Sequence, residues 1–285
     1  MKISKKKKTI VFTAAIVLVV LFVWTLWGNT ALELNTYTVR CEDLPDAFAG
    51  YRIAHISDLH NTEIGEDNEK LIAMLREAEP DIIAVTGDLI DSRKTDIDAA
   101  VRFAAQAVGI APVYYVTGNH EARVSEYADL REKLRELGVT VLEDERVTLE
   151  KEGESVVLIG ANDPSFRTDY LFGDSAAVME DKLRLLTQEE DGCRILLSHR
   201  PELFDVYAAN GADLVLAGHA HGGQIRLPFT GGLIAPNQGL FPEYDSGLYT
   251  AGKTNMVVSR GIGNSLFPLR FNNRPEVLLV LLTSA

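Results

Sequence analysis

The sequence predicts an α/β fold in which two packed mixed β-sheets are flanked by helices and preceded by one transmembrane helix. Three observations support this prediction. Apolar runs of strand length alternate with amphipathic stretches of helical period. Several of these runs end abruptly in polar residues, as buried strands do at the carboxyl edge of an open α/β sheet. An uncharged run of eighteen residues lies near the N-terminus.

The N-terminal region predicts a membrane anchor. A basic tail, residues 1–8, contains five lysines and precedes the apolar run Ile10–Trp27. A signal peptide has a shorter apolar core of about 7 to 15 residues and a small-residue cleavage site, whereas residues 28–33 offer a poor one. Eighteen apolar residues are enough to span a bilayer. We therefore predict an uncleaved signal-anchor over residues 9–27, with a cleaved signal peptide as the alternative.

The lysines also predict the orientation of the anchor, because basic flanks stay in the cytoplasm. The protein is then a single-pass protein of the cell membrane, with a cytoplasmic N-terminus and residues 28–285 outside the cytoplasm. Residues 28–49 are predicted to form a linker and a first strand, and residues 50–285 one domain of catalytic size. Cys41 and Cys193 could pair in such a compartment, although the sequence does not show that they meet.

The charge of the chain argues against a nucleic-acid partner. The formal net charge is -13, and without the five N-terminal lysines the remaining 23 basic and 41 acidic residues give -18. A body this acidic repels the phosphates of DNA and RNA. We therefore expect no nucleic acid among its partners.

The first half of the chain predicts three successive βα units. Its elements are a first strand at 32–40, then strand 52–56, helix 66–78, strand 81–86, helix 96–108, strand 113–116 and helix 125–137. Such units indicate parallel strands whose connecting loops carry function. Polar residues follow three of these strands, at 57–61, 87–91 and 117–121.

The second half predicts that the sheets become mixed. Its elements are strands 139–142, 147–150 and 155–159, helix 175–186, strand 194–197, helix 202–209 and strand 213–217. From Gly222 onward the chain is rich in glycine, proline and aromatic residues, with β-prone runs at 256–259 and 276–282. We predict that this part forms a second, antiparallel-rich sheet with long loops. Five polar strand ends should then meet at one rim.

The segment Gly218–Gln224, which reads Gly-His-Ala-His-Gly-Gly-Gln, contains two imidazoles two residues apart. In an extended segment such side chains point the same way, roughly 6.5 to 7 Å apart, so each could bind one of two adjacent metal ions. Two solvated loop histidines are the alternative. The other polar clusters favour the metal, since each also offers oxygen or imidazole donors. The candidate ligands are Asp58, His60, Asp88, Asn119, His199, His219 and His221.

Taken together, these clusters resemble the signature of the calcineurin-like metallophosphoesterase superfamily. That signature reads D-x-H, G-D-x-x-D, G-N-H-[DE], a lone H and G-H-x-H, and every part is present in order over roughly residues 50–285. Within the superfamily, the chain resembles the membrane-attached bacterial members of the YkuE and YaeI type. They share the Gly-His-x-His-Gly-Gly-Gln segment and a Pro-x-Arg-Phe tail like Pro268–Phe271.

The resemblance implies a dinuclear metal centre. Asp58, His60 and His221 would bind the first ion, Asn119, His199 and His219 the second, and Asp88 would bridge the two. Two ions joined in this way hold a bridging hydroxide for in-line attack on phosphorus. Imidazole ligands favour Mn, Fe or Zn over Mg or Ca. The resemblance makes His120 the catalytic residue, which protonates the leaving oxygen or stabilises the developing charge.

Other polar residues near these motifs have simpler explanations. Asp91 is expected to orient a ligand rather than to be one. His55, inside a strand, is expected to be a hydrogen-bonded core histidine, and Glu121 could simply fix its loop. Four more could line the substrate pocket or be solvated loop residues: Arg123, Asn162, Asp163 and Arg167.

The leading hypothesis is a membrane-anchored, extracytoplasmic phosphoesterase that hydrolyses phosphomonoesters or phosphodiesters. Its substrate would be a phosphate ester, and a lipid-linked or envelope-linked one is left open. One alternative is hydrolysis of the pyrophosphate bond of a lipid-linked nucleotide sugar, of the UDP-2,3-diacylglucosamine type. Another is a non-catalytic, metal-stabilised binding module, which the completeness of the motifs argues against.

Overall fold

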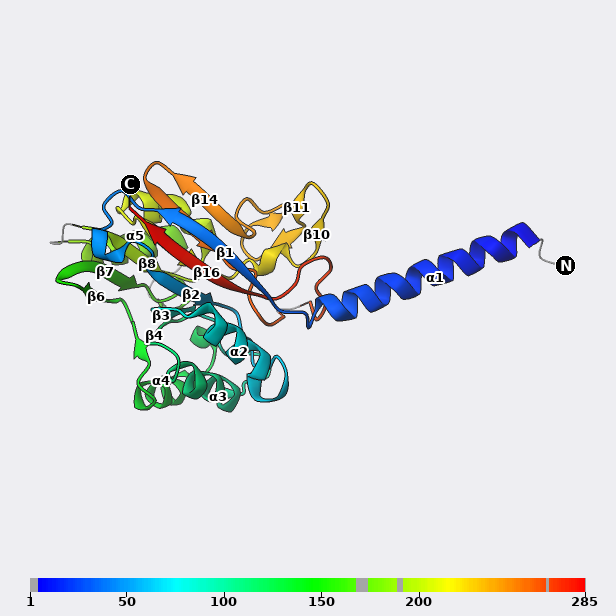
Figure 1. The fold of residues 1–285 in the computed structure, drawn as a ribbon, viewed down its shortest axis with the longest axis horizontal. Coiled ribbons are helices and arrows are strands. Elements are labelled where there is room, and N and C mark those ends of the chain that lie inside the picture. Colours follow the sequence, from blue (N-terminus) through cyan, green and yellow to red (C-terminus); the bar gives the residue numbers. More distant parts are fainter. Residues whose placement is uncertain (1–4, 168–173, 189–191, 265–266, 285) are drawn as a thin grey trace.

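The computed structural model describes residues 5–167, 174–188, 192–264 and 267–284, so part of the predicted basic tail, residues 1–4, lies outside the described chain. A long helix, α1 (Lys5–Gly28), projects from a body made of two sheets with helices on their outer faces (Figure 1). The inner faces of the sheets pack on each other through one shared apolar core. This arrangement confirms the predicted fold class.

The first sheet has the strand order β1, β16, β2, β3, β4, β5. Its strands are β1 (Glu33–Arg40), β2 (Arg52–Ile56), β3 (Ile82–Thr86), β4 (Val113–Val116), β5 (Thr140–Val141) and β16 (Glu276–Thr283). Strands β2 to β5 pair in parallel, as the βα units predicted. Helices α2 (Glu69–Ala78), α3 (Ile97–Ala107) and α4 (Tyr127–Glu136) cover its outer face and share one apolar core with it (Figure 1).

The second sheet has the order β14, β15, β9, β8, β7, β6. Its strands are β6 (Glu145–Lys151), β7 (Glu154–Gly160), β8 (Arg194–Leu197), β9 (Leu214–Ala217), β14 (Gly247–Ala251) and β15 (Thr254–Val258). Helices α5 (Ser175–Leu186) and α6 (Phe204–Ala209) share an apolar core with it. Two small hairpins stand outside both sheets, formed by β10 (Arg226–Leu227) with β11 (Gly231–Gly232), and by β12 (Ile234–Ala235) with β13 (Gly239–Leu240).

The prediction for the C-terminal strands was wrong in one respect. The run 276–282 was expected in the second sheet, but β16 lies in the first, parallel to β1 and antiparallel to β2. Its uninterrupted apolar run is buried on both faces, which requires a central position between strands rather than an edge. The second sheet is also less antiparallel than expected, because β15, β9, β8 and β7 pair in parallel and only its two edge pairs are antiparallel.

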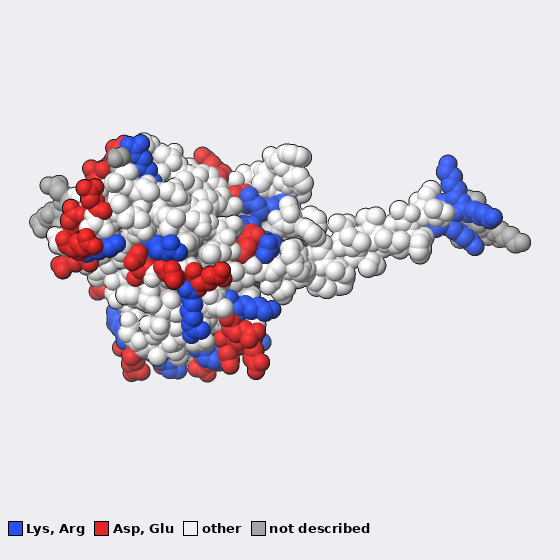
Figure 2. Space-filling view, viewed as in Figure 1, with Lys and Arg blue, Asp and Glu red and all other residues white. Residues whose placement is uncertain are grey.

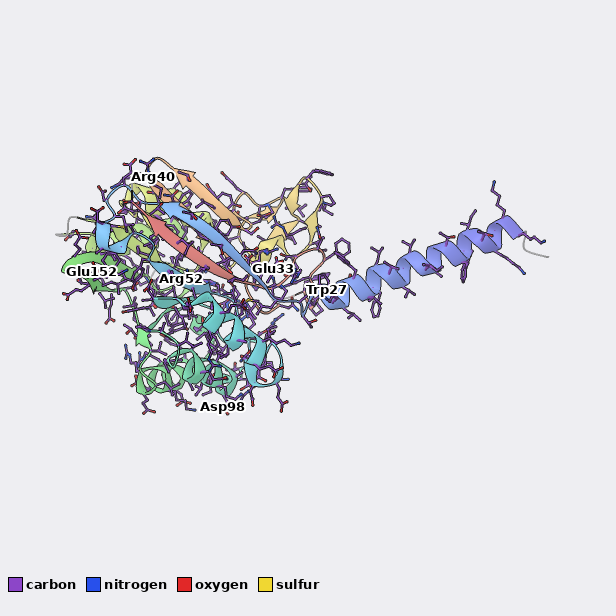
Figure 3. The ribbon with its side chains drawn as sticks, in the orientation of Figure 1. Trp27, Glu33, Arg40, Arg52, Asp98 and Glu152 are labelled. Carbon is purple, nitrogen blue, oxygen red and sulfur yellow. The ribbon has the colours of Figure 1, made fainter. Side chains whose placement is uncertain are left out.

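The strand directions decide where the polar strand ends lie. Strand β1 starts at Glu33, beside the junction with α1, and ends at Arg40 on the far side of the body (Figure 3). Because β2 is antiparallel to β16 and β16 is parallel to β1, β2 runs back toward α1. Strands β3 and β4 run the same way as β2. The polar residues that follow these strands therefore lie at the edge of the body from which α1 emerges.

Helix α1 is long and apolar enough to cross a membrane, by length and composition. Its most apolar window has a mean hydropathy of 2.6 and is not buried against the body. Twenty-four residues at 1.5 Å rise make it about 36 Å long. Figure 2 shows an uncharged shaft with the lysines of 5–8 at the end remote from the body.

The two cysteines lie together between the sheets. Both are free thiols and are completely buried in the core that the two sheets share. The Cys41 side chain, as a hydrogen-bond partner, and burial raise the pKa of the Cys193 thiol. The structure therefore brings into contact two residues that are 152 positions apart, which the sequence could not establish.

Candidate metal centre

The candidate ligands stand directly after the strands, in a strained backbone. The φ angle is positive at five of the seven: Asp58 (54°), His60 (45°), Asp88 (51°), His219 (65°) and His221 (48°). Left-handed backbone is unfavourable for residues with a side chain, and it persists where the surrounding structure enforces it. The five side chains are thereby turned away from the directions that regular strands would give them.

Glycines next to the ligands let the strand ends approach closely. A Cβ atom on Gly118 would lie 2.2 Å from Oδ1 of Asp88, and one on Gly218 would lie 1.8 Å from Oγ of Ser57 and 2.4 Å from Oδ2 of Asp58. No side chain fits at these distances. The glycines of the Gly-Asn-His-Glu and Gly-His-x-His motifs are therefore required by packing.

We expect Gly118→Ala to destabilise the body and displace Asp88, because the added methyl group meets both the side chain and the backbone of that residue. Overpacking of this kind costs about 1 to 3 kcal/mol. The thermal midpoint should fall by several degrees. Gly109→Ala is the matched control, because a Cβ there meets only one backbone oxygen, at 3.4 Å. Equal midpoints for the two variants would contradict the packing argument.

Asp58, His60 and His221 form the first group of ligand atoms. The Nε2 atoms of His60 and His221 lie 3.2 Å apart, and Oδ1 of Asp58 lies 3.3 Å from Nε2 of His221 and 3.8 Å from Nε2 of His60. All three side chains are buried. Burial alone would raise the pKa of Asp58, but the neighbouring imidazoles, His221 first, hold it well below its ordinary value.

Asp88, His199, His219 and Asn119 form the second group. Nδ1 of His199 lies 2.7 Å from the carbonyl oxygen of Thr86 and must donate to it, so Nε2 is the ring nitrogen left for a metal ion. This Nε2 lies 3.3 Å from Oδ2 of Asp88 and 3.2 Å from Nδ1 of His219. The assignment of these residues to two separate ions stays a prediction.

The amide of Asn119 lies between His219 and Arg123. One end is 2.9 Å from Nδ1 of His219, and the other is 3.2 and 3.3 Å from the two terminal nitrogens of Arg123. Without a cation, the amide nitrogen would donate to His219 and the oxygen would accept from Arg123. A cation beside His219 reverses this preference, since it draws the amide oxygen to that side. The orientation of this amide therefore depends on whether a metal is bound.

The Asp88 carboxylate lies between the two groups. Its Oδ2 is 3.5 Å from Nε2 of His60 and 3.3 Å from Nε2 of His199. Burial alone would raise the pKa of Asp88, but His199, followed by His60 and His120, lowers it well below the ordinary range. The pKa of His199 shifts in the opposite direction. Burial alone would lower it, but the nearby Asp88 carboxylate outweighs burial and raises the pKa of His199 to about 10.

This donor set fits two divalent cations. Ring nitrogens of four imidazoles lie 3.2 to 3.8 Å from one another or from the oxygens of two carboxylates. Nitrogens this close to one another need a proton or a metal cation between them. Imidazole with carboxylate is a donor set that suits Mn, Fe and Zn. The residues present are therefore suited to the metal centre that the sequence predicted.

His120 lies beside the two groups, with one ring nitrogen already engaged. Its Nδ1 accepts the backbone N–H of Ser92 at 2.9 Å, so the proton of the neutral ring is on Nε2. Nε2 is 3.9 Å from Oδ2 of Asp88. Burial lowers the pKa of His120 to about 4, which keeps the ring neutral near pH 7. His60, Asp88 and His120 also lie within 4.8 Å of one another, so His120 is close enough to reach an ion.

Glu121 and His55 have the places that the sequence suggested, whereas Asp91, which was expected to orient a metal ligand, accepts Nε–H of Arg93 at 2.9 Å. Glu121 is buried and accepts the backbone N–H groups of Gly118, Asp88 and Ile90 at 2.7 to 3.2 Å, which fixes two of the loops to each other. Oδ1 of Asp91 lies 3.6 Å from Nδ1 of His120. His55 is fully buried, with Nε2 2.7 Å from Oγ1 of Thr86, and is a core histidine.

A cleft of about 230 Å³ opens over the ligands. Arg123 lines it, as the sequence allowed, whereas Asn162, Asp163 and Arg167 do not. Asp163 instead makes a buried two-point ion pair with Arg200, at 2.6 and 2.9 Å. The sequence analysis missed five lining residues: Ser92, Arg93, Arg200, Pro236 and Asn237. Arg200 directly follows His199 in the sequence, and this position next to a candidate ligand could have identified it as a cleft residue.

Fold and site together define a class, the metal-dependent hydrolases that are built on two packed mixed sheets and gather their ligands at one rim. The chain belongs to the calcineurin-like phosphoesterase family, whose model matches residues 51–223. It is accordingly a hydrolase that acts on phosphate esters. Members of this family typically use a dinuclear metal centre, in agreement with the two groups of ligand atoms.

Relatives of known sequence support this membership. YkuE of Bacillus subtilis (strain 168), an uncharacterized metallophosphoesterase, is 30% identical over 260 residues, which cover 89% of this chain and 86% of YkuE. The phosphodiesterase YaeI of Escherichia coli (strain K12) is 28% identical over 240 residues, or 82% of this chain and 83% of YaeI. The solved structure of TT1561 from Thermus thermophilus shows the same fold. It has a TM-score of 0.52 at 16% identity and covers 75% of this chain and 90% of TT1561.

Proposed function

We propose that the protein is a membrane-anchored phosphoesterase with two divalent metal ions, whose catalytic domain, residues 50–285, lies outside the cytoplasm. The position of Asp88 carries the proposal, because its carboxylate lies within 3.5 Å of an imidazole from each ligand group. In this assignment Asp58, His60 and His221 hold one ion, and Asn119, His199 and His219 hold the other. Mn, Fe and Zn are the metals that this donor set favours.

Bound ions supply a nucleophile from water and neutralise the phosphoryl oxygens. The residues of the chain orient the substrate. Arg93, Arg123 and Arg200 line the cleft and can donate to a phosphate that enters it. The Nε2–H of His120 can donate to the leaving oxygen or to a phosphoryl oxygen. The cleft thus places positive charge and hydrogen-bond donors around a phosphate in an otherwise acidic protein.

The test uses the purified full chain, loaded in turn with Mn, Fe and Zn. The substrates are p-nitrophenyl phosphate, bis(p-nitrophenyl) phosphate and a UDP-linked diacylglucosamine, which represent monoester, diester and pyrophosphate bonds. Metal-dependent hydrolysis of either ester, removed by a chelator and restored by metal, is the expected result. Release of nucleoside monophosphate alone would favour the pyrophosphate hydrolase that the sequence left as an alternative.

The orientation of the anchor gives a separate prediction. A reporter fused after Ala285 should be active only outside the cytoplasm, because the N-terminal lysines retain that end inside. Alkaline phosphatase and green fluorescent protein fusions report the two locations. Fractionation should leave the intact chain in the membrane. A fluorescent protein fusion that is bright, together with a phosphatase fusion that is inactive, would show that the C-terminus lies in the cytoplasm. Release of a form that begins near Leu32 would show that the N-terminal segment is a cleaved signal peptide.

A further inference from the structure

We propose that the substrate is an amphiphile taken from the bilayer surface: a phosphate ester whose apolar tail enters a cavity beside the metal cleft. The inference rests on the proposed function and names its substrate class. Three features of the described chain carry it. They are an apolar cavity that adjoins the cleft, a direct structural connection from α1 to the ligands, and an uncharged surface near α1.

The cavity has a volume of about 290 Å³ and adjoins the metal cleft. His221 and Pro236 line both spaces, so a ligand can extend from one into the other. The remaining walls are mainly apolar, formed by Ala220, Gln224, Ile234, Ala235 and Phe267. Nε2 of Gln224 donates to the backbone oxygens of Phe267 and Leu269 at 2.9 and 3.0 Å. These hydrogen bonds hold this wall in place and already use the amide nitrogen of Gln224. A group bound here must be largely apolar, since few polar partners remain for it.

The end of α1 is connected to the metal ligands through a short series of contacts. Asn29 accepts the backbone N–H of Arg270 at 2.8 Å and donates to its carbonyl oxygen at 2.9 Å. The buried guanidinium of Arg270 donates to the carbonyl oxygen of Gly263. The backbone N–H of Gly263 in turn donates to the carbonyl oxygen of Asp58 at 2.7 Å. The metal centre is therefore only a few residues away from the point where the chain leaves the helix.

The aromatic residues at this junction place it at the level of the lipid headgroups. The guanidinium of Arg274 lies 4.9 Å from the ring centroid of Trp27 and donates to the carbonyl oxygens of Ala31 and Leu32. Tryptophan at the end of an apolar helix is typical of the membrane interface. Trp27 lies where α1 meets the body, close to Glu33 (Figure 3).

The surface near this junction includes long uncharged segments. Residues 227–242, 261–264 and 267–269 contain no Asp, Glu, Lys or Arg, in a chain in which 24% of residues are charged. Figure 2 shows an uncharged projection near the base of α1, with some charged side chains between the two. Several large apolar side chains on it are exposed: Phe229, Ile234, Leu240, Phe241, Phe267 and Leu269. A patch of this kind indicates an apolar partner, and its position near α1 identifies the bilayer as that partner.

These features give the substrate one geometry. The tail lies in the cavity between Ile234 and Phe267, and the phosphate lies over the ligands, on the other side of His221 and Pro236. Ile234 and Phe267 line the cavity and are also exposed, so the cavity adjoins the apolar surface described above. A lipid phosphate ester could then enter without leaving the bilayer surface completely, which spares the cost of exposing its tail to water.

The test measures how hydrolysis depends on tail length. The full chain is placed in nanodiscs of digalactosyldiacylglycerol, a lipid without phosphate, and loaded with Mn. The substrates are the methyl, butyl and octyl p-nitrophenyl phosphodiesters, which share one leaving group. Each methylene that enters an apolar cavity should raise kcat/KM about fourfold. The octyl ester should therefore exceed the methyl ester at least about tenfold, the value of two buried methylenes.

Variants separate the cavity from simple concentration of long esters at the bilayer. Ile234→Gln and Phe267→Gln alter partly exposed wall residues and should lower the octyl-to-methyl ratio of kcat/KM by roughly tenfold. Leu185→Gln is the matched control, because Leu185 is an exposed leucine on α5. Its ratio should equal that of the wild type.

Two results would overturn the inference. If all four proteins share one octyl-to-methyl ratio, or if the methyl ester is preferred, the tail does not bind in the cavity and the substrate is a soluble ester. Hydrolysis of the methyl ester would in that case still support the proposed function. If none of the esters is hydrolysed with any of the three metals, the proposed function fails and the inference fails with it.

Discussion

Replacing Asp88 by Asn should abolish metal binding at both sites and reduce turnover more than any change to a ligand of one ion. Asparagine keeps the shape and the oxygen that accepts the backbone N–H of His120 at 2.9 Å. It removes the negative charge and the Oδ2 ligand that lies between His60 and His199. Loss of a residue that only orients a ligand lowers metal affinity about 10- to 100-fold. Loss of a carboxylate shared by two ions should cost more than that.

Asp58→Asn is the matched comparison for this variant. Asp58 is equally buried and equally close to imidazoles, but its carboxylate lies among the donor atoms of the first group, and its contact with the second group is to the backbone N–H of His219, at 3.0 Å. Elemental analysis of the purified proteins should show loss of both ions in Asp88→Asn and loss of mainly one in Asp58→Asn. Two equivalents of metal retained by Asp88→Asn would contradict the bridging position.

The second large effect is expected at His120. His120→Ala should keep both metals and lower kcat by roughly 10² to 10³, the usual cost of removing one hydrogen-bond donor, because the neutral ring donates through Nε2–H. The acceptor role of Nδ1 toward Ser92 directs the Nε2–H into the cleft. The loss should be larger for an alkyl phosphate ester than for a nitrophenyl ester. An alkoxide accumulates more charge on the leaving oxygen and depends more on a donor.

Two control variants, together with the ester comparison, distinguish the possible roles of His120. Ser92→Ala removes a hydroxyl 3.2 Å from Nδ1 but retains the backbone donor, so it should have little effect on kcat. His120→Asn retains an N–H donor and should recover part of the loss. Equal losses on aryl and alkyl esters would show that His120 contacts phosphoryl oxygens instead. A missing metal ion in His120→Ala would show that it is a ligand.

Local sequence patterns predicted most of the fold. Strands β2, β3 and β4 and helices α2, α3 and α4 were predicted because each apolar period ends at a glycine, a proline or a polar cluster. The place of β16 could not be predicted in this way. Its apolar run satisfies a central position in either sheet, and the choice depends on pairing with β1 and β2, more than 200 residues earlier in the chain.

The candidate site was predictable where its residues share motifs, and not elsewhere. The motifs identified seven candidate ligands, and the structure brings six of them into groups that could hold a metal ion, with Asn119 next to His219. Pro236 and Asn237 were missed because they lie in a loop without a regular period. Asp163 was misjudged because its partner Arg200 comes from another strand end, and only the fold reveals that ion pair.

The pairing of β1 with β16 also determines the order in which the molecule can fold. Asn35 and Glu276, joined by a side-chain hydrogen bond of 2.6 Å, are separated by 241 positions. During synthesis, the first strand emerges soon after α1 and must wait for nearly the whole chain before β16, its neighbour in the sheet, exists. Contacts of such high sequence separation form slowly and leave strand edges exposed meanwhile. A chain truncated before β16 would leave the edge of β2 uncovered, and uncovered edges promote pairing with other chains.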